Sequence, residues 1–382
     1  MEHSFHYLIR AVGLPLSESL PNPLIKSVTC DSRKVKKGSL FLGIPGENYD
    51  GGNFWQEAFS LGAVAAVIGS TAAKLYPPNT DDAIVIIDEN VEKWFGELLS
   101  VFWGNPSSDL CLIGVTGTNG KTTTTHLIEY LSSALGKQTA LLGTLVNRWP
   151  MHEEVATHTT SSPEVLQETL SKVVKENVQI AAMEVSSHSL SQYRVAGCRF
   201  TGLVFTNLTQ DHLDYHGSME EYFEAKKLLF KQNYYKNLDM NPIVNVDNKW
   251  GALLAKQLDD RCWKCSLDNQ VIETENVELY IKHIELISEG IKGHLYSPAG
   301  NGVFVSSLIG RFNLMNLLQA IGVLVQQKLP LQKILDAVRD FPGVPGRMER
   351  ITFSKVGDIQ QMPTVVVDYA HTPDALRQVL VG

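Results

Sequence analysis

The chain has 382 residues and a formal net charge of −8, with 44% hydrophobic and 19% charged residues. This balance is typical of a globular protein, and the length corresponds to ~2–3 domains. The negative charge argues against non-specific binding to nucleic acid or to anionic membranes, so local donors must hold any anionic ligand.

The compartment can also be predicted from composition. The five cysteines are scattered, which is typical of a reducing environment. The N-terminal stretch "MEHSFHYLIRAVGLPLSESL" is a poor signal peptide. The longest apolar run, "LGAVAAVIG", is shorter than the ~20 residues that span a bilayer. We therefore expect a cytoplasmic protein without membrane insertion or a nucleic-acid partner, and a monomer by default.

Breaks rich in turn-forming residues divide the chain into three predicted domains of α/β class. Residues 1–103 contain short β-rich runs such as "AVAAVIG" and "AIVIID", and end before the turn-rich "GNPSSD". Residues 104–342 alternate buried strands with helices, which indicates a mostly parallel sheet flanked by helices, with a possible antiparallel extension at "VELYIKHIEL" and "GVFVSSLIG". Residues 343–382 follow "FPGVPGRME" and are too few for a domain core, so we interpret them as the beginning of an incomplete C-terminal domain.

A loop for phosphate binding is predicted in "GVTGTNGKTTTTHLIEYL", which starts at Gly114. It lies between an apolar strand and a helix, where backbone N–H groups, Lys121 and the helix N-terminus can hold phosphate and the Thr122 hydroxyl can reach Mg²⁺. The common form of this loop has a glycine where Val115 stands.

Two further motifs follow predicted strands. In "MEVSSHSLSQYR", Glu184 ends an apolar strand, and either Mg²⁺ or a structural salt bridge would satisfy its carboxylate. "TNLTQDHLDYHGSMEEYFEAKKLLF" carries Asp and His side chains at a spacing that suits either a metal site or helix caps.

Two other patterns have structural explanations that we favour from the residues alone. Thr159, Thr160 and Ser161 precede a helix in "HTTSSPE", which is typical of capping. "CWKC" has no second cysteine pair, so alternation along a strand explains it better than a metal or redox site.

Together these motifs resemble the Mur ligases, ATP-dependent amide-forming enzymes of peptidoglycan synthesis. The resemblance covers nearly the whole chain in the order of the family, and is carried by "DSR", "TGTNGKTT", "THTTSSP", "MEVSSHSL", "TNLTQDHLDYHG", "EAKK", "GRFNLMN", "PGRME" and "DYAHTPD". The loop with Val115 is the family's own variant. The combination is most similar to the MurE branch, which adds the third amino acid to UDP-N-acetylmuramoyl-L-Ala-D-Glu.

The resemblance implies an N-terminal domain that binds the UDP end of this substrate, a central phosphate-loop domain and a Rossmann-like C-terminal domain. The loop at residues 47–49 departs from the branch's usual His-Gln pair, and His158 stands where asparagine is often found. The implied contacts to the nucleotide-sugar and its peptide are Cys30, Ser32, Glu47, Asn48, Tyr49, His158, Thr159, Thr160, Ser186, Gln192 and Arg194.

For ATP, the resemblance implies contacts from Gly117, Thr118, Asn119, Gly120, Lys121, Thr122, Thr123, Asn316, Arg347 and Asp368. Thr122 and Glu184 would share one Mg²⁺, and His212 would help to hold a second. Lys226 in "EAKK" would be carboxylated by CO₂, which would turn a cation into a metal ligand. The implied catalytic residues are Lys121, Glu184, His212 and Lys226.

The implied reaction forms an acyl phosphate from the D-Glu γ-carboxylate and ATP, which the amine of a diamino acid then attacks. We favour meso-diaminopimelate over L-lysine because it is the commoner substrate of the branch. Two alternatives stay open: a ligase similar to folylpolyglutamate synthetase, and a fragment that binds ATP and the UDP substrate with little or no ligation.

Overall fold

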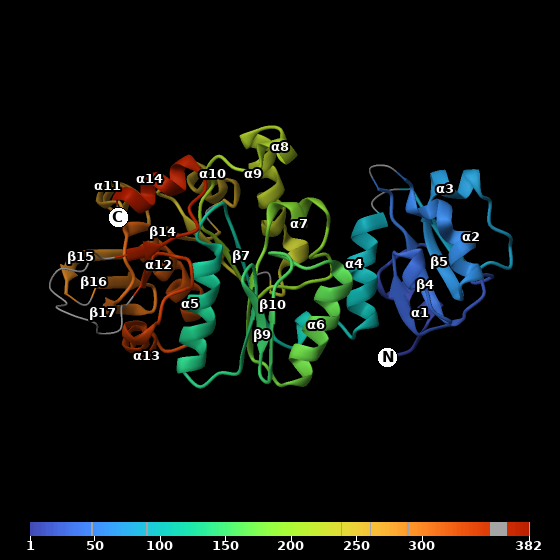
Figure 1. The fold of residues 1–382 in the computed structure, drawn as a ribbon, viewed down its shortest axis with the longest axis horizontal. Coiled ribbons are helices and arrows are strands. Elements are labelled where there is room, and N and C mark those ends of the chain that lie inside the picture. The colour runs from blue at the N-terminus through green and yellow to red at the C-terminus, as the bar shows by residue number, and fades with distance from the viewer. Residues whose placement is uncertain are drawn as a thin grey trace. The chain divides into compact units, whose positions relative to one another are not determined.

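The computed structural model describes residues 1–46, 49–88, 91–237, 239–259, 261–288, 290–351 and 365–381, which form two compact units (Figure 1). Unit 1 comprises Met1–Asp109, Ser161–Lys175 and His188–Arg199, and unit 2 comprises Leu110–Thr160, Glu176–Ser187 and Phe200–Gly382. Unit 1 therefore includes two segments that follow the predicted phosphate loop in sequence.

Unit 1 contains a parallel sheet with the strand order β3-β4-β5-β6 and a small antiparallel pair, β1 and β2. Its strands are β1 (His3–Ser4), β2 (Leu24–Ile25), β3 (Ser27–Thr29), β4 (Ser39–Gly43), β5 (Ala63–Gly69) and β6 (Ile84–Ile87). Its helices are α1 (Phe5–Ala11), α2 (Trp55–Ser60), α3 (Ser70–Leu75), α4 (Val91–Phe102) and α6 (Pro163–Lys175), with 3₁₀ turns η1 (Ser32–Lys34), η2 (Gly51–Phe54) and η3 (Pro106–Ser108).

Alternation along the strands gives this sheet two apolar faces. Leu40 and Leu42 of β4 join the core that α1 and α4 cover, whereas Phe41 between them packs with Trp55 and Ala58 of α2 on the opposite face. Figure 1 shows β4 and β5 between α4 and the pair α2 and α3. Both faces are buried, as expected for parallel strands.

Unit 2 is built on an eleven-stranded sheet with the order β10-β9-β8-β11-β7-β12-β13-β14-β15-β16-β17. The strands from β8 to β15 in this order pair in parallel, and those at both edges pair antiparallel. The strands are β7 (Cys111–Thr116), β8 (Thr139–Leu142), β9 (Val146–Trp149), β10 (His152–Val155), β11 (Ile180–Glu184), β12 (Gly202–Phe205), β13 (Ile243–Asn245), β14 (Trp263–Ser266), β15 (Leu279–Ile287), β16 (Gly290–Ser297) and β17 (Gly300–Ser306).

Helices follow the strands of unit 2 and bury their apolar faces on the sheet. Leu127, Ile128 and Leu131 of α5 and most of α12 share one core with Ile113 of β7. The helices are α5 (Lys121–Ala134), α8 (Leu213–His216), α9 (Met219–Lys227), α10 (Lys249–Gln257), α11 (Asn269–Thr274), α12 (Arg311–Gln326) and α13 (Leu331–Ala337); α7 (Ser187–Ser191) lies where unit 2 passes into unit 1, and the 3₁₀ turns are η4 (Leu228–Phe230), η5 (Gln232–Tyr234) and η6 (Val338–Asp340).

The last described part of unit 2 contains β18 (Glu349–Ile351), which pairs antiparallel with β19 (Val365–Val367), and α14 (Pro373–Val381). The α/β prediction is confirmed, including the mostly parallel central sheet and the antiparallel extension at β15, β16 and β17. Most of "CWKC" lies in β14, as the prediction of a strand requires, but burial does not alternate along it: Cys262, just before the strand, and Cys265 are buried, and Trp263 and Lys264 between them are half-buried.

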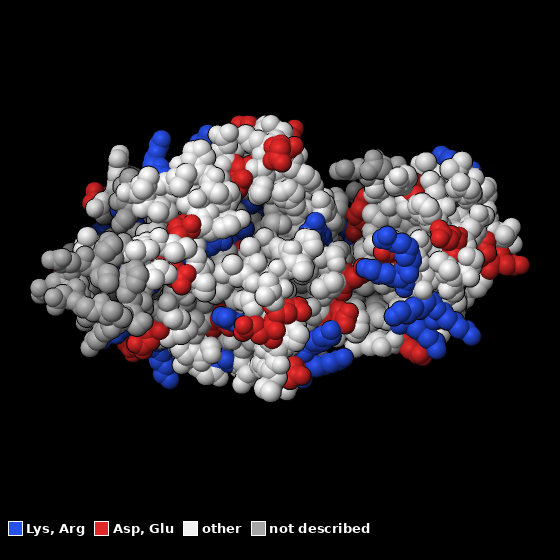
Figure 2. All heavy atoms as spheres, viewed as in Figure 1, with Lys and Arg blue, Asp and Glu red and all other residues white. Residues whose placement is uncertain are grey.

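On the face shown in Figure 2, acidic and basic side chains are interspersed on the described surface. Among the described residues, none of the helices combines the length and the apolar character needed to cross a bilayer.

A close contact at Gly251 of α10 gives a stability prediction. A Cβ at this position would lie 1.8 Å from the carbonyl oxygen of Asn245 at the end of β13. Helix propensity alone favours alanine over glycine by about 1 kcal/mol. We expect the opposite sign, because Gly251→Ala must push α10 from the sheet and lower the free energy of unfolding by roughly 1–3 kcal/mol.

Urea denaturation measures this difference. The control is Gly69→Ala, where an added Cβ meets nothing within 4 Å. A Gly251→Ala variant at least as stable as the parent chain would contradict the packing at the β13 to α10 junction.

Candidate active site

The predicted phosphate loop runs from Thr116, the last residue of β7, to Lys121, the first residue of α5. Gly117 has φ of 147° and Gly120 has φ of 88°, a region of φ that side chains with a Cβ rarely adopt. A Cβ on Gly117 would lie 1.9 Å from Thr206 Oγ1, and one on Gly120 would lie 2.3 Å from Asn316 Oδ1. Both glycines are therefore required by conformation and by space.

The segment after β12 supports this loop. The Thr206 hydroxyl donates to the Asn119 carbonyl at 2.6 Å, and the Asn119 N–H donates to Asn207 Oδ1 at 3.0 Å. The Thr209 N–H and the Thr118 hydroxyl lie 3.1 Å apart, and Thr118 N–H donates to the Asn207 carbonyl at 2.9 Å. The shape of the loop is thus fixed by contacts with residues about ninety positions later in the sequence.

Two lysines, the half-buried Lys121 and the buried Lys226, donate to the same carbonyl of the loop. Lys121 Nζ lies 3.0 Å from the Gly117 oxygen and 2.8 Å from the Thr118 oxygen, and Lys226 Nζ lies 2.8 Å from the Gly117 oxygen. Burial lowers the pKa of Lys121. Burial, and then the charge of Lys121, hold the pKa of Lys226 well below its ordinary value, while Asp211 acts in the opposite direction.

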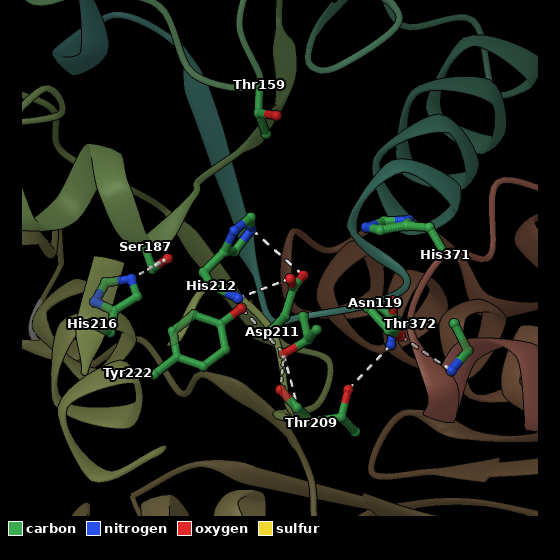
Figure 3. A network of polar contacts seen from close by, with 12 residues as sticks. Asn119, Thr159, Ser187, Thr209, Asp211, His212, His216, Tyr222, His371 and Thr372 are labelled. Carbon is green, nitrogen blue, oxygen red and sulfur yellow. Dashed lines mark hydrogen bonds and ion pairs between the residues drawn. The ribbon is translucent and has the colours of Figure 1, made fainter. Parts of the chain in front are cut away.

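Lys226 lies against Tyr222, which belongs to a network with His216 and Ser187 that Figure 3 shows. Lys226 and Tyr222 are one turn apart on α9, and Lys226 Nζ lies 4.7 Å from the centroid of the Tyr222 ring. The Tyr222 hydroxyl accepts a hydrogen bond from Thr118 at 3.2 Å. His216 stacks on Tyr222 with centroids 4.9 Å apart, and His216 Nε2 lies 2.9 Å from Ser187 Oγ.

Glu184 ends β11, which lies between β8 and β7 in the sheet, and its side chain is fully buried. Its Oε2 accepts from the Thr122 hydroxyl at 3.1 Å and from the Thr144 hydroxyl at 2.9 Å, and its Oε1 accepts from the Thr144 N–H at 2.9 Å. Among the described residues, hydroxyl and amide groups are the hydrogen-bond partners of this carboxylate, in place of the salt bridge that was the alternative from the sequence.

His212 has φ of 50°, and its N–H donates to Asp211 Oδ1 at 2.8 Å. The His212 ring, 46% exposed as a side chain, lies 3.5 Å from Asp211 Oδ2. Burial lowers the pKa of His212, and the charges of Lys226 and Lys121 lower it further, against the effect of Asp211. Figure 3 shows His212 beside Asp211, and His212 lies close enough to both lysines for their charges to lower its pKa.

Three predicted ATP contacts come from late in the chain. Asn316, on α12, is buried against Gly120 and donates to Asn313 Oδ1 at 3.2 Å. The Arg347 guanidinium lies 4.5 Å from the Tyr369 ring centroid, and its charge lowers the pKa of Lys121. Asp368 accepts from backbone N–H groups on both sides of the β18 and β19 pair, those of Met348 and Ala370, each at 2.8 Å.

The residues predicted to bind the UDP substrate are divided between the units. In unit 2, the Thr160 hydroxyl donates to the Glu184 carbonyl at 2.9 Å and accepts from Ser186 N–H at 3.1 Å, and Thr159 Oγ1 lies 3.1 Å from Thr144 Oγ1. His158 is exposed and lies 3.1 Å from Thr157 Oγ1. The sequence favours helix capping for Thr159, Thr160 and Ser161, whereas in the structure the Thr159 hydroxyl contacts Thr144 and the Thr160 hydroxyl contacts the Glu184 carbonyl.

In unit 1, Arg194 donates to Gln192 Oε1 at 2.9 and 2.7 Å. Burial raises the pKa of Cys30 to about 12, so its thiol stays neutral. Ser32 begins η1, and Tyr49 is 74% exposed. Glu47 and Asn48 lie outside the described residues.

The donor set near the loop fits Mg²⁺ chemically, because the Thr122 hydroxyl and the Glu184 carboxylate are oxygen ligands on adjacent elements. Among the described residues, no three His, Cys, Asp or Glu side chains come together as a metal-binding group.

Several residues that shape the site were not predicted from the sequence. Thr144 follows β8, Thr206 and Thr209 follow β12, and Tyr222 precedes Lys226 by one turn. The available signal was a small polar residue directly after a buried strand, as in "LLGT" and "VFTNLT". Their long-range partners could not be read from local sequence.

Comparison of the sequence with known protein families identifies the family to which the chain is similar. Residues 115–324 match the Mur ligase middle domain, and residues 24–103 match the catalytic domain of the Mur ligase family. A UDP-N-acetylmuramoyl-L-alanyl-D-glutamate--2,6-diaminopimelate ligase of Prochlorococcus marinus (strain MIT 9313) is 56% identical over 380 residues, which cover 100% of this chain and 75% of that protein. The ligase with the same name from Parasynechococcus marenigrum (strain WH8102) is 54% identical with the same coverage.

A solved structure of a ligase with this name superposes with a TM-score of 0.78 at 30% identity, covering 100% of this chain and 74% of that one. A folylpolyglutamate synthase from Mycobacterium tuberculosis covers 74% of this chain with a TM-score of 0.55 at 17% identity, which shows the fold alone.

A strand, a glycine-containing loop and a helix N-terminus form the arrangement of a phosphate-loop protein. With the family matches and the identities given above, the chain belongs to the Mur ligase family.

The shared carbonyl of Gly117 gives a titration prediction. Because the charge of Lys121 lowers the pKa of Lys226, Lys121→Met should raise the pKa of Lys226 and decrease the fraction of neutral amine at a fixed pH. Burial remains, so the pKa should stay below the ordinary ~10.4 of lysine.

Nuclear magnetic resonance titration of the lysine Cε signals measures this change. Lys227→Met is the matched control, because Lys227 is adjacent in sequence but contacts Glu224. An unchanged or lower Lys226 pKa in Lys121→Met would show that the two ammonium groups are not coupled.

Proposed function

We propose that this chain is an ATP-dependent ligase of peptidoglycan precursor synthesis. It joins a diamino acid, meso-diaminopimelate, to the D-Glu γ-carboxylate of UDP-N-acetylmuramoyl-L-Ala-D-Glu and forms ADP and phosphate. The observation that carries this proposal is the identity of 50–56% over 380 or more residues to relatives named as the 2,6-diaminopimelate ligase. The site supports it, because the phosphate loop and the buried Glu184 lie together in unit 2.

We assign the nucleotide to the loop. Backbone N–H groups from Gly117 to Thr123 and the N-terminus of α5 would hold its phosphates. Lys121 would leave the Gly117 and Thr118 carbonyls for the terminal phosphate, and its charge would offset the repulsion between two anionic reactants. Asn316 would contact adenine, and Arg347 and Asp368 would approach the nucleotide from residues 343–382.

Mg²⁺, held by Thr122 and Glu184 with His212 at a second ion, would supply charge neutralisation at the phosphates. Lys226 would serve as a metal ligand after carboxylation by CO₂. The depressed pKa of Lys226 supports this modification, because a neutral amine is the form that reacts with CO₂. Carboxylation would also replace one of two cations on the Gly117 carbonyl with an anion.

We assign the UDP end of the second substrate to residues 1–103, with Cys30, Ser32 and the loop to Tyr49, and its peptide end to the central residues 104–342. There, His158, Thr159, Thr160, Ser186, Gln192 and Arg194 are the proposed contacts. Thr159 and Thr160 support this assignment because both contact the Glu184 region, where the D-Glu carboxylate must meet ATP.

The acceptor distinguishes this proposal from a folate ligase. We expect UDP-N-acetylmuramoyl-L-Ala-D-Glu to bind the chain in calorimetric titration, and a folate substrate to show no heat of binding. Lys121→Ala should abolish detectable binding of MgATP while leaving the UDP substrate bound, because the variant removes a cation from the phosphate loop only.

Lys172→Ala, an exposed lysine on α6, is the control for loss of charge. Phosphate release with either acceptor, and with meso-diaminopimelate or L-lysine, then reports turnover. Binding of folate in preference to the UDP substrate, or normal MgATP binding by Lys121→Ala, would refute the proposed function.

Carboxylation of Lys226 can be observed directly. With ¹³C-labelled bicarbonate, we expect a carbamate signal that disappears in Lys226→Arg, because guanidinium does not form a stable carbamate under these conditions. Lys227→Arg should keep the signal, since Lys227 Nζ lies near Glu224 instead of the loop. A carbamate signal that survives in Lys226→Arg would place the modification elsewhere.

A further inference from the structure

The Glu184 carboxylate lies in a cradle made by the two residues that follow β8. Thr144 donates its backbone N–H to Oε1 and its hydroxyl to Oε2, both at 2.9 Å, so one residue contacts both oxygens. A Cβ on Gly143 would lie 2.4 Å from Oε1. The absence of a side chain at Gly143 therefore leaves the space in which the carboxylate lies while it accepts both hydrogen bonds from Thr144.

The same hydroxyl faces the predicted substrate loop. Thr144 Oγ1 lies 3.1 Å from Thr159 Oγ1, and Thr159 is adjacent to Thr160, whose hydroxyl donates to the Glu184 carbonyl. The Thr144 hydroxyl is the donor to both Glu184 Oε2 and Thr159 Oγ1, and its one proton is shared between these two acceptors. Thr144 therefore lies between the Glu184 carboxylate and the loop that carries Thr159.

The orientation of the Glu184 carboxylate depends on Thr144, because Thr144 supplies two of the three hydrogen bonds that it accepts. The third donor, the Thr122 hydroxyl at 3.1 Å, is also the hydroxyl proposed to bind Mg²⁺. If Thr122 turns toward a metal ion, Thr144 is the residue that still holds the orientation of the carboxylate. A buried carboxylate without such donors would be costly to keep ionised.

We propose that Thr144 is a positioning residue that orients Glu184 for Mg²⁺ and links it through Thr159 to the loop that holds the peptide substrate. This inference rests on the proposed function, in which Glu184 is a metal ligand. Through this orientation, Gly143 and Thr144 would determine how strongly Mg²⁺ enhances the binding of ATP.

The experiment measures ATP affinity by calorimetry in excess Mg²⁺ and again in EDTA, and the ratio of the two dissociation constants is the metal gain. Thr144→Val removes the hydroxyl and keeps the shape, so we expect the metal gain to fall roughly 10-fold, as for the loss of a hydrogen bond to a charged group. Affinity in EDTA should not change. Thr144→Ser should restore the gain, because it restores the hydroxyl.

Two further variants complete the design. Gly143→Ala pushes on Oε1 without changing a donor and should also decrease the metal gain. Thr157→Val, an exposed threonine of the same loop that contacts His158, should leave it unchanged. If Thr144→Val fails to fold, as judged by its melting temperature, Gly143→Ala decides the question.

Glu184→Gln distinguishes a failure of the role inferred for Thr144 from a failure of the metal-binding role proposed for Glu184. If it decreases the metal gain but Thr144→Val and Gly143→Ala do not, the role of Thr144 is overturned and the proposed function stands. If Glu184→Gln itself leaves the metal gain unchanged, the metal role of Glu184 is wrong and the inference fails with it.

Discussion

The carbonyl oxygen of Gly117 is the point on which the site depends. It accepts hydrogen bonds from two ammonium groups, that of the half-buried Lys121 at 3.0 Å and that of the buried Lys226 at 2.8 Å. Burial, and then the repulsion between these two cations, depresses the pKa of Lys226. The site therefore favours any change that brings negative charge to the loop, whether from phosphate or from modification of an amine.

The sheet explains how distant residues reach this carbonyl. β7, β11 and β12 are adjacent parallel strands, and their carboxyl ends deliver the phosphate loop, Glu184 and the segment from Thr206 to Thr209 to one edge. α9 then presents Tyr222 and Lys226 on one face, toward Thr118 and Gly117.

The sequence predicts the strands, the loop and the charged residues well, because each of them has a local pattern. The buried strands are apolar runs, the glycines mark the loop, and Glu184 ends a strand where a carboxylate is unusual. The sequence cannot predict the supporting contacts in the same way, since Thr144 and Thr206 are ordinary threonines until the fold places them beside Glu184 and Asn119. For Thr159 and Thr160, the local pattern indicates a helix cap. Their partners in the fold, the Thr144 hydroxyl and the Glu184 carbonyl, are distant in sequence and follow or end strands of the central sheet.

The departure of the loop from the common phosphate-loop pattern follows from the same contacts. Val115, which stands in place of the first glycine, is fully buried in the central strand β7 and pairs with Glu184 of β11 and Val204 of β12. A glycine there would weaken a strand that neighbours on both sides require. The loop does not need that glycine for its shape, because Thr206, Asn207 and Thr209 hold it from outside. The turn can therefore begin at Gly117, while the strand continues with an apolar residue up to Thr116.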